Sequence, residues 1–344
     1  MQADPEQWLR VTPRGLYCPV GDFYVDPTRP VDRAVVTHGH ADHARAGHKA
    51  VLATRETLAI METRLGRVTG AQVLAPGETV SLGGVSVSLH PAGHVLGSAQ
   101  VLMDYKGARV VVSGDFKRRA DPTCAPFEVV PCDVFVTEAT FALPVFRHPD
   151  PALELAKVLE ALTLFPERTL LLGAYSLGKA QRMIALLRAA GYDAPLYVHG
   201  AVAKICTLYE DQGVPLGDLR PVPDGERLAG SLVIRPPGTL GSHSFADPLV
   251  AMASGWMRVR GRSRGRSRDV ELPLIVSDHA DWDELVMTLS DVGSPRIWVT
   301  HGREDALVRQ AKLMGKEAKA LSLIGYGERE REREREEEDG EPPP

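Results

Sequence analysis

The residues that decide the fold lie at positions 34–43, where the chain has the sequence AVVTHGHADH. A short apolar run, typical of a buried strand, leads directly into a polar turn. The turn places three imidazoles and a carboxylate within six residues, from His38 to His43. Imidazole and carboxylate ligands favour zinc, manganese or iron over calcium. This stretch therefore predicts a metal site at the end of a strand.

Strands and helices alternate around this stretch. Residues 85–89 alternate between apolar and polar side chains, and residues 109–115 and 133–140 are apolar runs that end in polar residues. Residues 55–65 have the apolar spacing of a helix. Strands that alternate with helices and end in polar side chains indicate a layered α/β fold.

The sequence resembles the metallo-β-lactamase superfamily. The signature of that superfamily, HxHxDH, is present as His38, His40, Asp42 and His43. Further along, PAGHVLGSAQ matches the third motif and implies that His94 is a ligand, and VVVSGDF matches the fourth and implies that Asp115 bridges two metals. Asp26, in YVDPT, matches an aspartate that supports the ligand loop, with a plain turn-forming role as the alternative.

Three further matches point to the β-CASP branch, which cuts nucleic acid. Glu138 in VTEAT, His279 in SDHADW and His301 in VTHGRED match its motifs A, B and C. The resemblance covers nearly all of the chain up to residue 326. It implies an α/β fold, the four-layer αββα metallo-β-lactamase fold with an inserted β-CASP α/β domain.

A change in the pattern of predicted strands and helices marks the insertion. From about residue 149 the chain repeats a strand–loop–helix pattern, which predicts a small parallel sheet. We therefore expect a β-CASP insertion at 149–269, a metallo-β-lactamase domain in two parts at 1–148 and 270–327, and a disordered charged tail at 328–344.

The resemblance also implies a ligand set for two divalent metals, with zinc expected and manganese as the alternative. One metal would be held by His38, His40, His94 and Asp115. The other would be held by Asp42, His43, Asp115 and His301. Two such metals can share a hydroxide and clamp both oxygens of a phosphodiester that is being displaced.

Three residues are expected to take part in the chemistry, namely Asp42, Glu138 and His279. His279 would donate a proton to the leaving oxygen, and Glu138 would orient its imidazole. For His279 the alternative is a surface or capping histidine. For Glu138 it is a helix cap or an ion pair with an arginine.

Contacts with nucleic acid are expected in two places. Ser176 and Lys179 lie between a predicted strand and a predicted helix, where a helix N-terminus can bind phosphate. Arg258 and Arg260 begin a run of six arginines in eleven residues with no acid between them. Such a run can neutralise several phosphates. The alternatives are a simple helix start and a solvated loop, and Trp256 is expected to fill core.

Composition is that of an ordinary globular enzyme, with 44% apolar and 25% charged residues. The chain has no run of 18 apolar residues, which argues against a membrane span. Its four scattered cysteines suit a reducing cytoplasm. The net charge of −5 equals the charge of the tail alone, so any affinity for nucleic acid must come from a local patch.

Within the branch, APLYVHGAV, SGWMRVRG and VSDHADW are most similar to bacterial ligase-associated DNA exonucleases, also described as mRNA 3′-end-processing-factor-like. The resemblance implies a cytoplasmic DNA exonuclease in repair, alongside an ATP-dependent ligase and a helicase, with a homodimer left open. His301 keeps an RNA-processing ribonuclease as the alternative, because RNA-cutting relatives carry histidine there. A small-molecule ester or thioester hydrolase is the third hypothesis. A catalytically silent nucleic-acid-binding subunit is disfavoured because every ligand position is filled.

Overall fold

A computed structural model describes the chain except for residues 1, 224–227, 243, 260–269 and 322–344. The described residues form two compact units. The first combines residues 2–144 with residues 279–321, and the second consists of residues 145–278. The insertion predicted at 149–269 falls within the second unit, and its limits stay predictions. The predicted tail lies outside the described residues.

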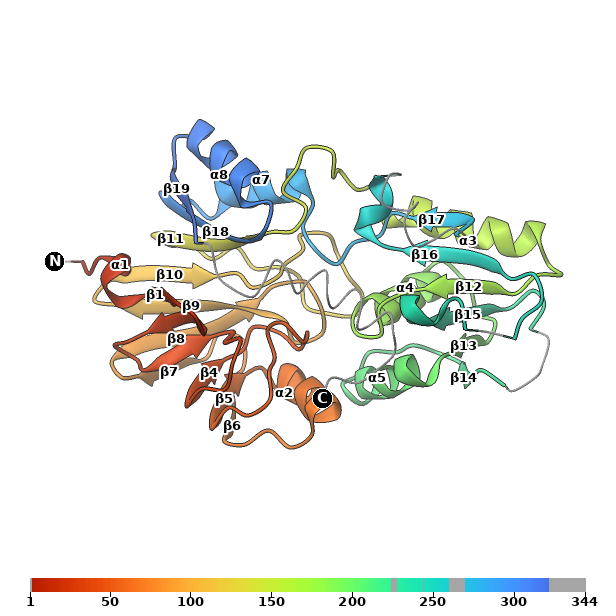
Figure 1. Ribbon diagram of the computed structural model, residues 1–344, viewed down its shortest axis with the longest axis horizontal. Helices are drawn as coiled ribbons and strands as arrows, with labels where there is room; N and C mark the ends of the chain where they lie inside the picture. The colour runs from red at the N-terminus through yellow and green to blue at the C-terminus, as the bar shows by residue number, and fades with distance from the viewer. Residues whose placement is uncertain (1, 224–227, 243, 260–269, 322–344) are drawn as a thin grey trace. The chain divides into compact units, whose positions relative to one another are not determined.

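The first unit begins with α1 (Pro5–Trp8) and a six-stranded sheet whose strands follow chain order (Figure 1). Its strands are β1 (Arg10–Thr12), β2 (Gly15–Cys18), β3 (Phe23–Val25), β4 (Arg33–Val35), β5 (Ala50–Ala53) and β6 (Ala71–Val73). β1, β2 and β3 pair antiparallel, whereas β3 to β6 pair parallel. The carboxyl ends of β3 and β4 therefore meet at one edge, where the His38 loop begins.

A seven-stranded mixed sheet forms the second layer of strands in this unit, in the order β19-β18-β11-β10-β9-β8-β7. Its strands are β7 (Thr79–Leu82), β8 (Val85–Pro91), β9 (Ala99–Tyr105), β10 (Ala108–Val112), β11 (Val134–Ala139), β18 (Arg296–Gly302) and β19 (Glu317–Ala320). The pairs β10–β11 and β11–β18 are parallel, so the residues after these strands also share one edge.

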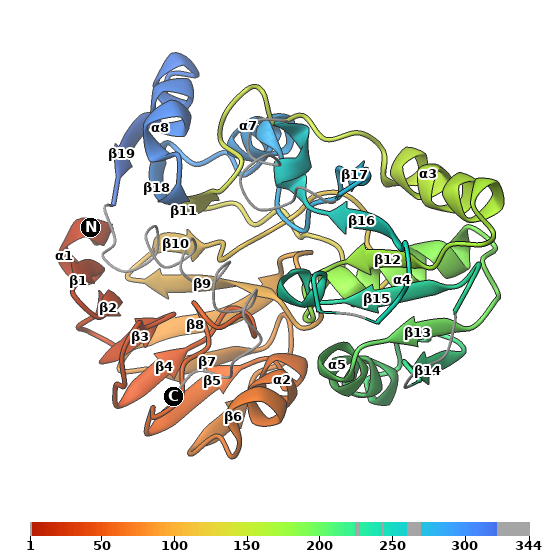
Figure 2. The ribbon, with the colours of Figure 1, turned by 45° about the vertical axis from the view of Figure 1, so that its right-hand side comes forward.

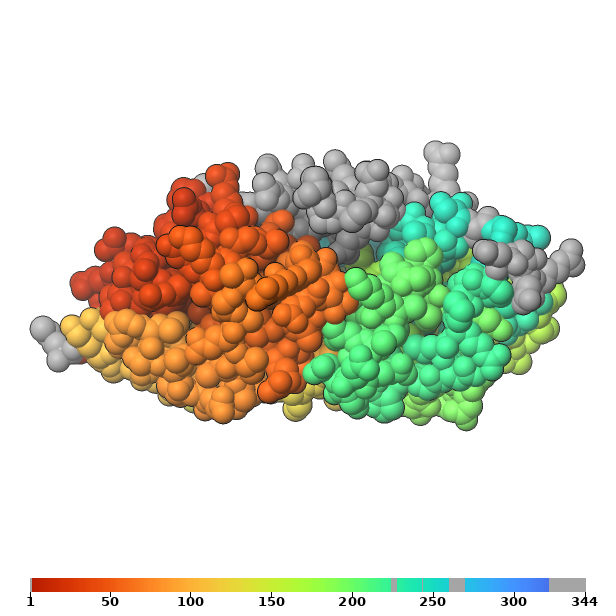
Figure 3. All heavy atoms as spheres, turned by 90° about the horizontal axis from the view of Figure 1, so that it is seen from below, coloured from red at the N-terminus to blue at the C-terminus, as the bar shows by residue number. Residues whose placement is uncertain are grey.

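A single core cluster joins the inner faces of these two sheets. Leu16 and Val25 from the first sheet pack in it with Val87 and Val101 from the second. Alternation explains this, because successive side chains of a strand point to opposite faces. On the face that Figure 3 shows, residues of the first sheet, in red to orange, lie beside residues of the second, in lighter orange.

Helices cover parts of the outer faces. α2 (Arg55–Leu65) lies beside β5 and β6 of the first sheet in Figure 2. Its Leu58 and Met61 pack in a cluster with residues of β4 and β5. It begins at Thr54, whose hydroxyl accepts from the Thr57 N–H. α7 (Trp282–Asp291) and α8 (Glu304–Leu313) contribute to a cluster with the second sheet. The predicted α/β class is confirmed.

The second unit has a six-stranded sheet in which every pair is parallel, in the order β14-β13-β15-β12-β16-β17. Its elements are α3 (Pro151–Leu164), β12 (Leu170–Gly173), α4 (Lys179–Ala189), β13 (Leu196–Val198), α5 (Gly200–Asp211), β14 (Leu219–Pro221), β15 (Leu232–Arg235), η1 (Pro237–Thr239), β16 (Leu249–Ala253), η2 (Gly255–Arg258) and β17 (Leu272–Leu274). The small parallel sheet predicted from the strand–loop–helix rhythm is confirmed. Among the described residues, no helix has the length and hydropathy needed to cross a bilayer.

Candidate metal centre

The predicted ligands of the first unit follow strands whose carboxyl ends meet at one edge. His38, Asp42 and His43 follow β4, and Asp115 follows β10. His94 lies in the loop between β8 and β9. Parallel pairing brings loops from strands far apart in the sequence together, so ligands from three segments can reach one site.

Close packing against α2 holds the first ligand loop. A Cβ atom at Gly39 would overlap the side chain of Ile60, so only glycine allows the loop to lie this close to the helix. The Arg64 guanidinium, one turn further along α2, donates to the Gly39 carbonyl at 2.6 Å. The helix therefore fixes the backbone between His38 and His40.

Asp26 sets the protonation of two ligand imidazoles. Its carboxylate accepts from the Thr37 N–H at 2.8 Å, from the Thr37 hydroxyl at 2.6 Å and from His43 Nδ1 at 2.7 Å. Because the Thr37 hydrogen goes to Asp26, the Thr37 oxygen accepts from His38 Nδ1 at 3.0 Å. Both rings then carry their hydrogen on Nδ1, which leaves each Nε2 lone pair for a metal.

The Nε2 nitrogens of three histidines lie around Asp115. One Asp115 oxygen lies 3.4 Å from His38 Nε2, 3.5 Å from His43 Nε2 and 3.8 Å from His94 Nε2. His94 Nε2 is also hydrogen-bonded to His40 Nδ1 at 2.9 Å. Among the described residues, three groups have ligand atoms all within 4.8 Å of one another. They are His38, His40, His94 with Asp115, then His38 with Asp42 and His43, and finally Asp115 with Glu138 and His279. The donors are imidazole nitrogens and carboxylate oxygens, which fits zinc or manganese.

Burial and charge set the protonation of this group. Burial lowers the pKa of His40 to about 3 and the pKa of His94 well below its ordinary value, so both rings are neutral. Burial also opposes the charged forms of His43 and Asp115. Their mutual attraction outweighs it, raising the pKa of His43 and lowering that of Asp115. A metal that binds here would replace a proton, because ligands bind in their deprotonated form.

His301 lies at the margin of these groups. Its ring centroid is 5.2 Å from that of His43, and its ligand atoms belong to none of the three groups of close donors. Its backbone is left-handed, with φ of 55°, an unusual conformation for a residue other than glycine. Such strain clusters at functional sites. The prediction that His301 is a ligand stays a prediction.

Glu138 and His279 form the predicted pair. Glu138, at the end of β11, accepts from His279 Nδ1 at 2.9 Å through one oxygen and from the Phe116 N–H at 2.7 Å through the other. Glu138 is 1% exposed, whereas the His279 side chain is 22% exposed. Since Nδ1 donates to the carboxylate, Nε2 is the ring atom left to exchange a proton with a bound molecule.

The predicted phosphate contacts have a different environment. The Lys179 ammonium is buried, donating to the Val276 carbonyl at 2.8 Å and lying 3.0 Å from Asp278. It would have to leave these partners to reach a phosphate. Ser176 and Arg258 are partly or fully exposed, while Arg260 lies outside the described residues. All four assignments stay predictions.

Trp256 packs its ring edge-on against Phe146, with centroids 5.1 Å apart, and is half-buried, so its expected core role stays a prediction.

Sequence reasoning missed three positioning residues. Thr37 and Arg64 act on the ligand loop as described above, and the buried Lys117 ammonium donates to the His94 carbonyl at 3.4 Å and pairs with Asp121 at 2.6 Å. Thr37 had a usable signal, because it directly precedes the HxHxDH stretch. Arg64 and Lys117 had none, since their roles depend on tertiary contacts.

Comparisons with known proteins find relatives that match most of this chain. A probable DNA ligase of Opitutus terrae is 30% identical over 89% of this chain, and a ribonuclease of Thermus thermophilus is 27% identical over 89% of both chains. An endoribonuclease of Gibberella zeae is 25% identical over 54% of this chain. The alignments cover only 30% of the Opitutus protein and 23% of the Gibberella protein. No family model matches the chain.

Among solved structures, a protein of unknown function from Enterococcus faecalis has a similar fold. The TM-score is 0.56 at 12% identity, and the match covers 83% of this chain and 78% of that one. At this identity the similarity concerns the fold alone.

Proposed function

Since this chain belongs to the β-CASP branch of the metallo-β-lactamase superfamily, we propose that it is a metal-dependent nuclease that hydrolyses DNA. The observation that carries the proposal is the convergence of His38, His43 and His94 on Asp115 beside the Glu138–His279 pair. A small-molecule hydrolase needs the first feature only. The paired histidine gives the site a proton donor for a leaving group.

We propose two metal positions that share Asp115. The first would be held by His38, His40, His94 and Asp115, and the second by Asp42, His43, Asp115 and His301. When bound, the metals supply Lewis acidity and make hydroxide available near neutral pH. Asp26 and Thr37 hold the ligand tautomers, and the buried walls exclude bulk water from the phosphate.

His279 is the proposed proton donor to the leaving oxygen, acting from Nε2. Glu138 holds Nδ1 and stabilises the imidazolium that precedes the transfer. The Phe116 N–H fixes the other Glu138 oxygen, so the carboxylate cannot rotate away. The partial exposure of His279 leaves its ring accessible to a substrate.

We also propose the family's layer arrangement, its role in repair and its partners for this chain. A core between two sheets, with α2 on one outer side and α7 and α8 on the other, supports the four-layer αββα arrangement. The relative named a probable DNA ligase supports a link to DNA ligation. An exonuclease in cytoplasmic DNA repair that works with an ATP-dependent ligase is proposed from the family resemblance. A helicase partner and a homodimer are proposed from the family resemblance alone.

RNA is the second candidate substrate. It is favoured by the similarity to proteins named as a ribonuclease and an endoribonuclease, the first of which matches over 89% of both chains. The chemistry of the site is the same for both polymers, because the scissile bond is a phosphodiester in each.

One experiment separates these functions. The purified chain, loaded with zinc or manganese, is incubated with one sequence as 5′-phosphorylated single-stranded DNA and as RNA, beside an Asp115→Ala control. Stepwise shortening of DNA alone, lost in the control, is the expected result. Preferential cleavage of RNA would assign the second candidate. A metal-loaded chain that cuts neither polymer would refute the nuclease proposal and direct attention to small esters.

A further inference from the structure

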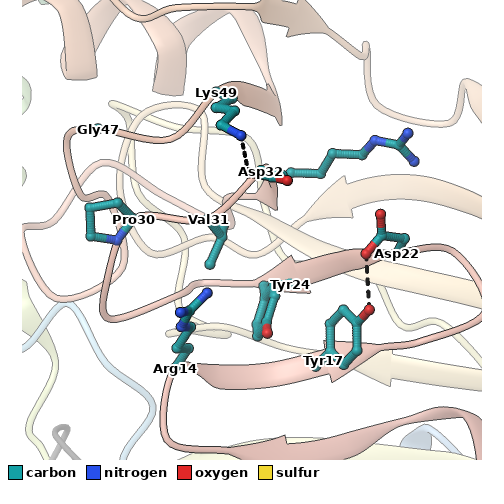
Figure 4. A pocket seen from close by; sticks show the side chains of 10 residues that line it. Arg14, Tyr17, Asp22, Tyr24, Pro30, Val31, Asp32, Gly47 and Lys49 are labelled. Atoms are coloured by element: carbon teal, nitrogen blue, oxygen red, sulfur yellow. Dashed lines mark hydrogen bonds and ion pairs between the residues drawn. The ribbon is translucent and has the colours of Figure 1, made fainter.

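The first unit carries a surface groove of about 270 Å³ that is separate from the metal centre (Figure 4). We call it the tyrosine groove and define it by Arg14, Tyr17, Tyr24, Asp32, Arg33 and Lys49. It lies on the outer face of the first sheet. Leu16, Cys18, Phe23 and Val25 of the same strands face the core between the sheets, and the tyrosines alternate with them.

Two stacked rings form the floor of the groove. Tyr17 and Tyr24 are direct cross-strand partners, with centroids 4.4 Å apart and planes 29° from parallel. The Tyr17 hydroxyl donates to Asp22 at 2.9 Å, and this bond raises the pKa of Tyr17. The rings are half-buried, so they present a neutral aromatic surface that remains accessible from the groove.

The rim of the groove is cationic. Among the described residues, the Arg14 guanidinium makes no hydrogen bond or ion pair, and Arg33 donates only to the Gly21 carbonyl at 3.4 Å. Lys49 pairs with Asp32 at 2.8 Å, as the dashed line in Figure 4 shows. Hydrogen bonding to Lys49, with the charges of Arg14 and Arg33, lowers the pKa of Asp32. Asp32 thus has Lys49 as its partner and Asp22 accepts from Tyr17, while neither Arg14 nor Arg33 forms an ion pair.

We propose that the tyrosine groove binds single-stranded nucleic acid, with a base on the tyrosine pair and the adjacent phosphates at Arg14 and Arg33. Aromatic platforms flanked by cations are the general means of holding single strands without reading their sequence. The volume lies just below the range of small-molecule sites, which suits one nucleotide of a longer strand.

The groove is tied to the metal centre through one connection. β3 contains Tyr24 and is followed directly by Asp26, which accepts from His43 Nδ1, and the segment after Asp26 continues to Asp32 on the groove rim. A nucleic-acid strand bound both in the tyrosine groove and at the metal centre would be held at a second point away from the bond that is cut. The inference rests on the proposed function in this respect only, that the bound strand is the substrate of the nuclease.

The test measures binding without cleavage. The full chain carrying Asp115→Ala is titrated into a fluorescein-labelled oligothymidylate, and anisotropy is followed at several salt concentrations. Arg14→Glu with Arg33→Glu should weaken binding at least about tenfold and reduce the salt slope by about 1.4, since each single-strand phosphate contact contributes roughly 0.7. Arg309→Glu, at an exposed position on α8, is the matched control and should change affinity little.

A second pair of measurements isolates stacking. Tyr17→Leu and Tyr24→Leu keep apolar volume, and their folding is checked by thermal melting. Each should weaken binding of the oligothymidylate about fivefold or more, the usual loss for one stacked base. Neither should affect an abasic strand of equal length. Equal losses on both strands would overturn the stacking assignment.

The remaining outcomes separate the two proposals. A parent chain that binds the oligonucleotide while all groove variants bind it equally well would refute the groove and leave the proposed function intact. A parent chain that binds neither DNA nor RNA would refute both. Displacement of the strand by a polyglutamate peptide as readily as by unlabelled oligonucleotide would identify the groove as a site for acidic proteins instead.

Discussion

Each unit of the molecule buries a cluster of ionisable side chains, and the two clusters treat charge in opposite ways. In the second unit, Lys179 and Arg182 lie at the start of α4 and meet Asp278 at 3.0 and 3.2 Å. Both cations also donate to backbone carbonyls, Lys179 to Val276 and Arg182 to Ser277. Each positive charge therefore has a carboxylate partner, and this cluster holds the chain in place.

The cluster of the first unit gathers several rings around one carboxylate. The Nε2 atoms of His38, His43 and His94 lie 3.4, 3.5 and 3.8 Å from one Asp115 oxygen, and such contacts become attractive only when a proton or a metal ion is bound to the ring nitrogens. Burying electron-pair donors around an anion is costly unless a cation joins them. The contrast shows that burial and titratable residues alone do not identify a functional site. A functional metal site is indicated where buried nitrogen and oxygen ligands need a bound cation to compensate them.

Among the substitutions that test this contrast, Asp115→Ala should have the largest effect. Without the shared carboxylate, we expect both metal positions to lose affinity and cleavage to fall by roughly a thousandfold or more. Metal content by mass spectrometry and cleavage rates are measured together. Glu160→Ala, which removes an exposed carboxylate from α3, is the matched control. Retention of both metals by Asp115→Ala would show that Asp115 does not bridge them.

Asp278→Ala tests the cluster of the second unit. It leaves Lys179 and Arg182 as buried charges without their carboxylate, which typically costs about 3–5 kcal/mol of folding stability. Urea denaturation of the metal-free chain measures the loss, with Asp211→Ala at the exposed end of α5 as the control. A loss no larger than that of the control would mean that the carbonyls suffice to neutralise these cations.

Glu138→Gln separates proton transfer from metal binding. The amide oxygen can still accept from Phe116, but the charge that stabilises a protonated His279 is gone. We expect kcat to fall about a hundredfold, within the usual range for acid–base groups, with metal content unchanged. Unchanged kcat would remove the pair from the chemistry, and loss of metal would reassign Glu138 to the ligand set.

Local patterns carried most of what could be predicted from the sequence. The helix expected at 55–65 has those bounds, because its apolar spacing and the Thr54 cap act within one turn. α3 begins at Pro151 for a similarly local reason, since Asp150 caps it and proline fits its first turn. The candidate ligands that the family resemblance implies, apart from His301, also lie together in the first unit.

Long-range partners could not be predicted in this way. The sequence around Lys179 suggests a phosphate site, yet Val276 and Asp278, nearly a hundred residues away, hold the ammonium. Arg64 reaches the Gly39 carbonyl only because α2 packs over the ligand loop with its Arg64 side facing that loop. Such roles depend on packing geometry, which periodicity does not encode.

The smallest effect is expected from Asp26→Asn. Asparagine tolerates the left-handed backbone of this position, where φ is 45°, and its amide oxygen can still accept from Thr37. It carries less charge to hold the Nδ1 hydrogens of His38 and His43, so metal affinity should fall about tenfold, the lower end for residues that orient ligands. Asp22→Asn, at a left-handed position with φ of 50°, is the control for backbone effects and should bind metal as the parent does. Competition with a chromophoric chelator measures both, and equal affinities would show that Asp26 shapes the turn without tuning the ligands.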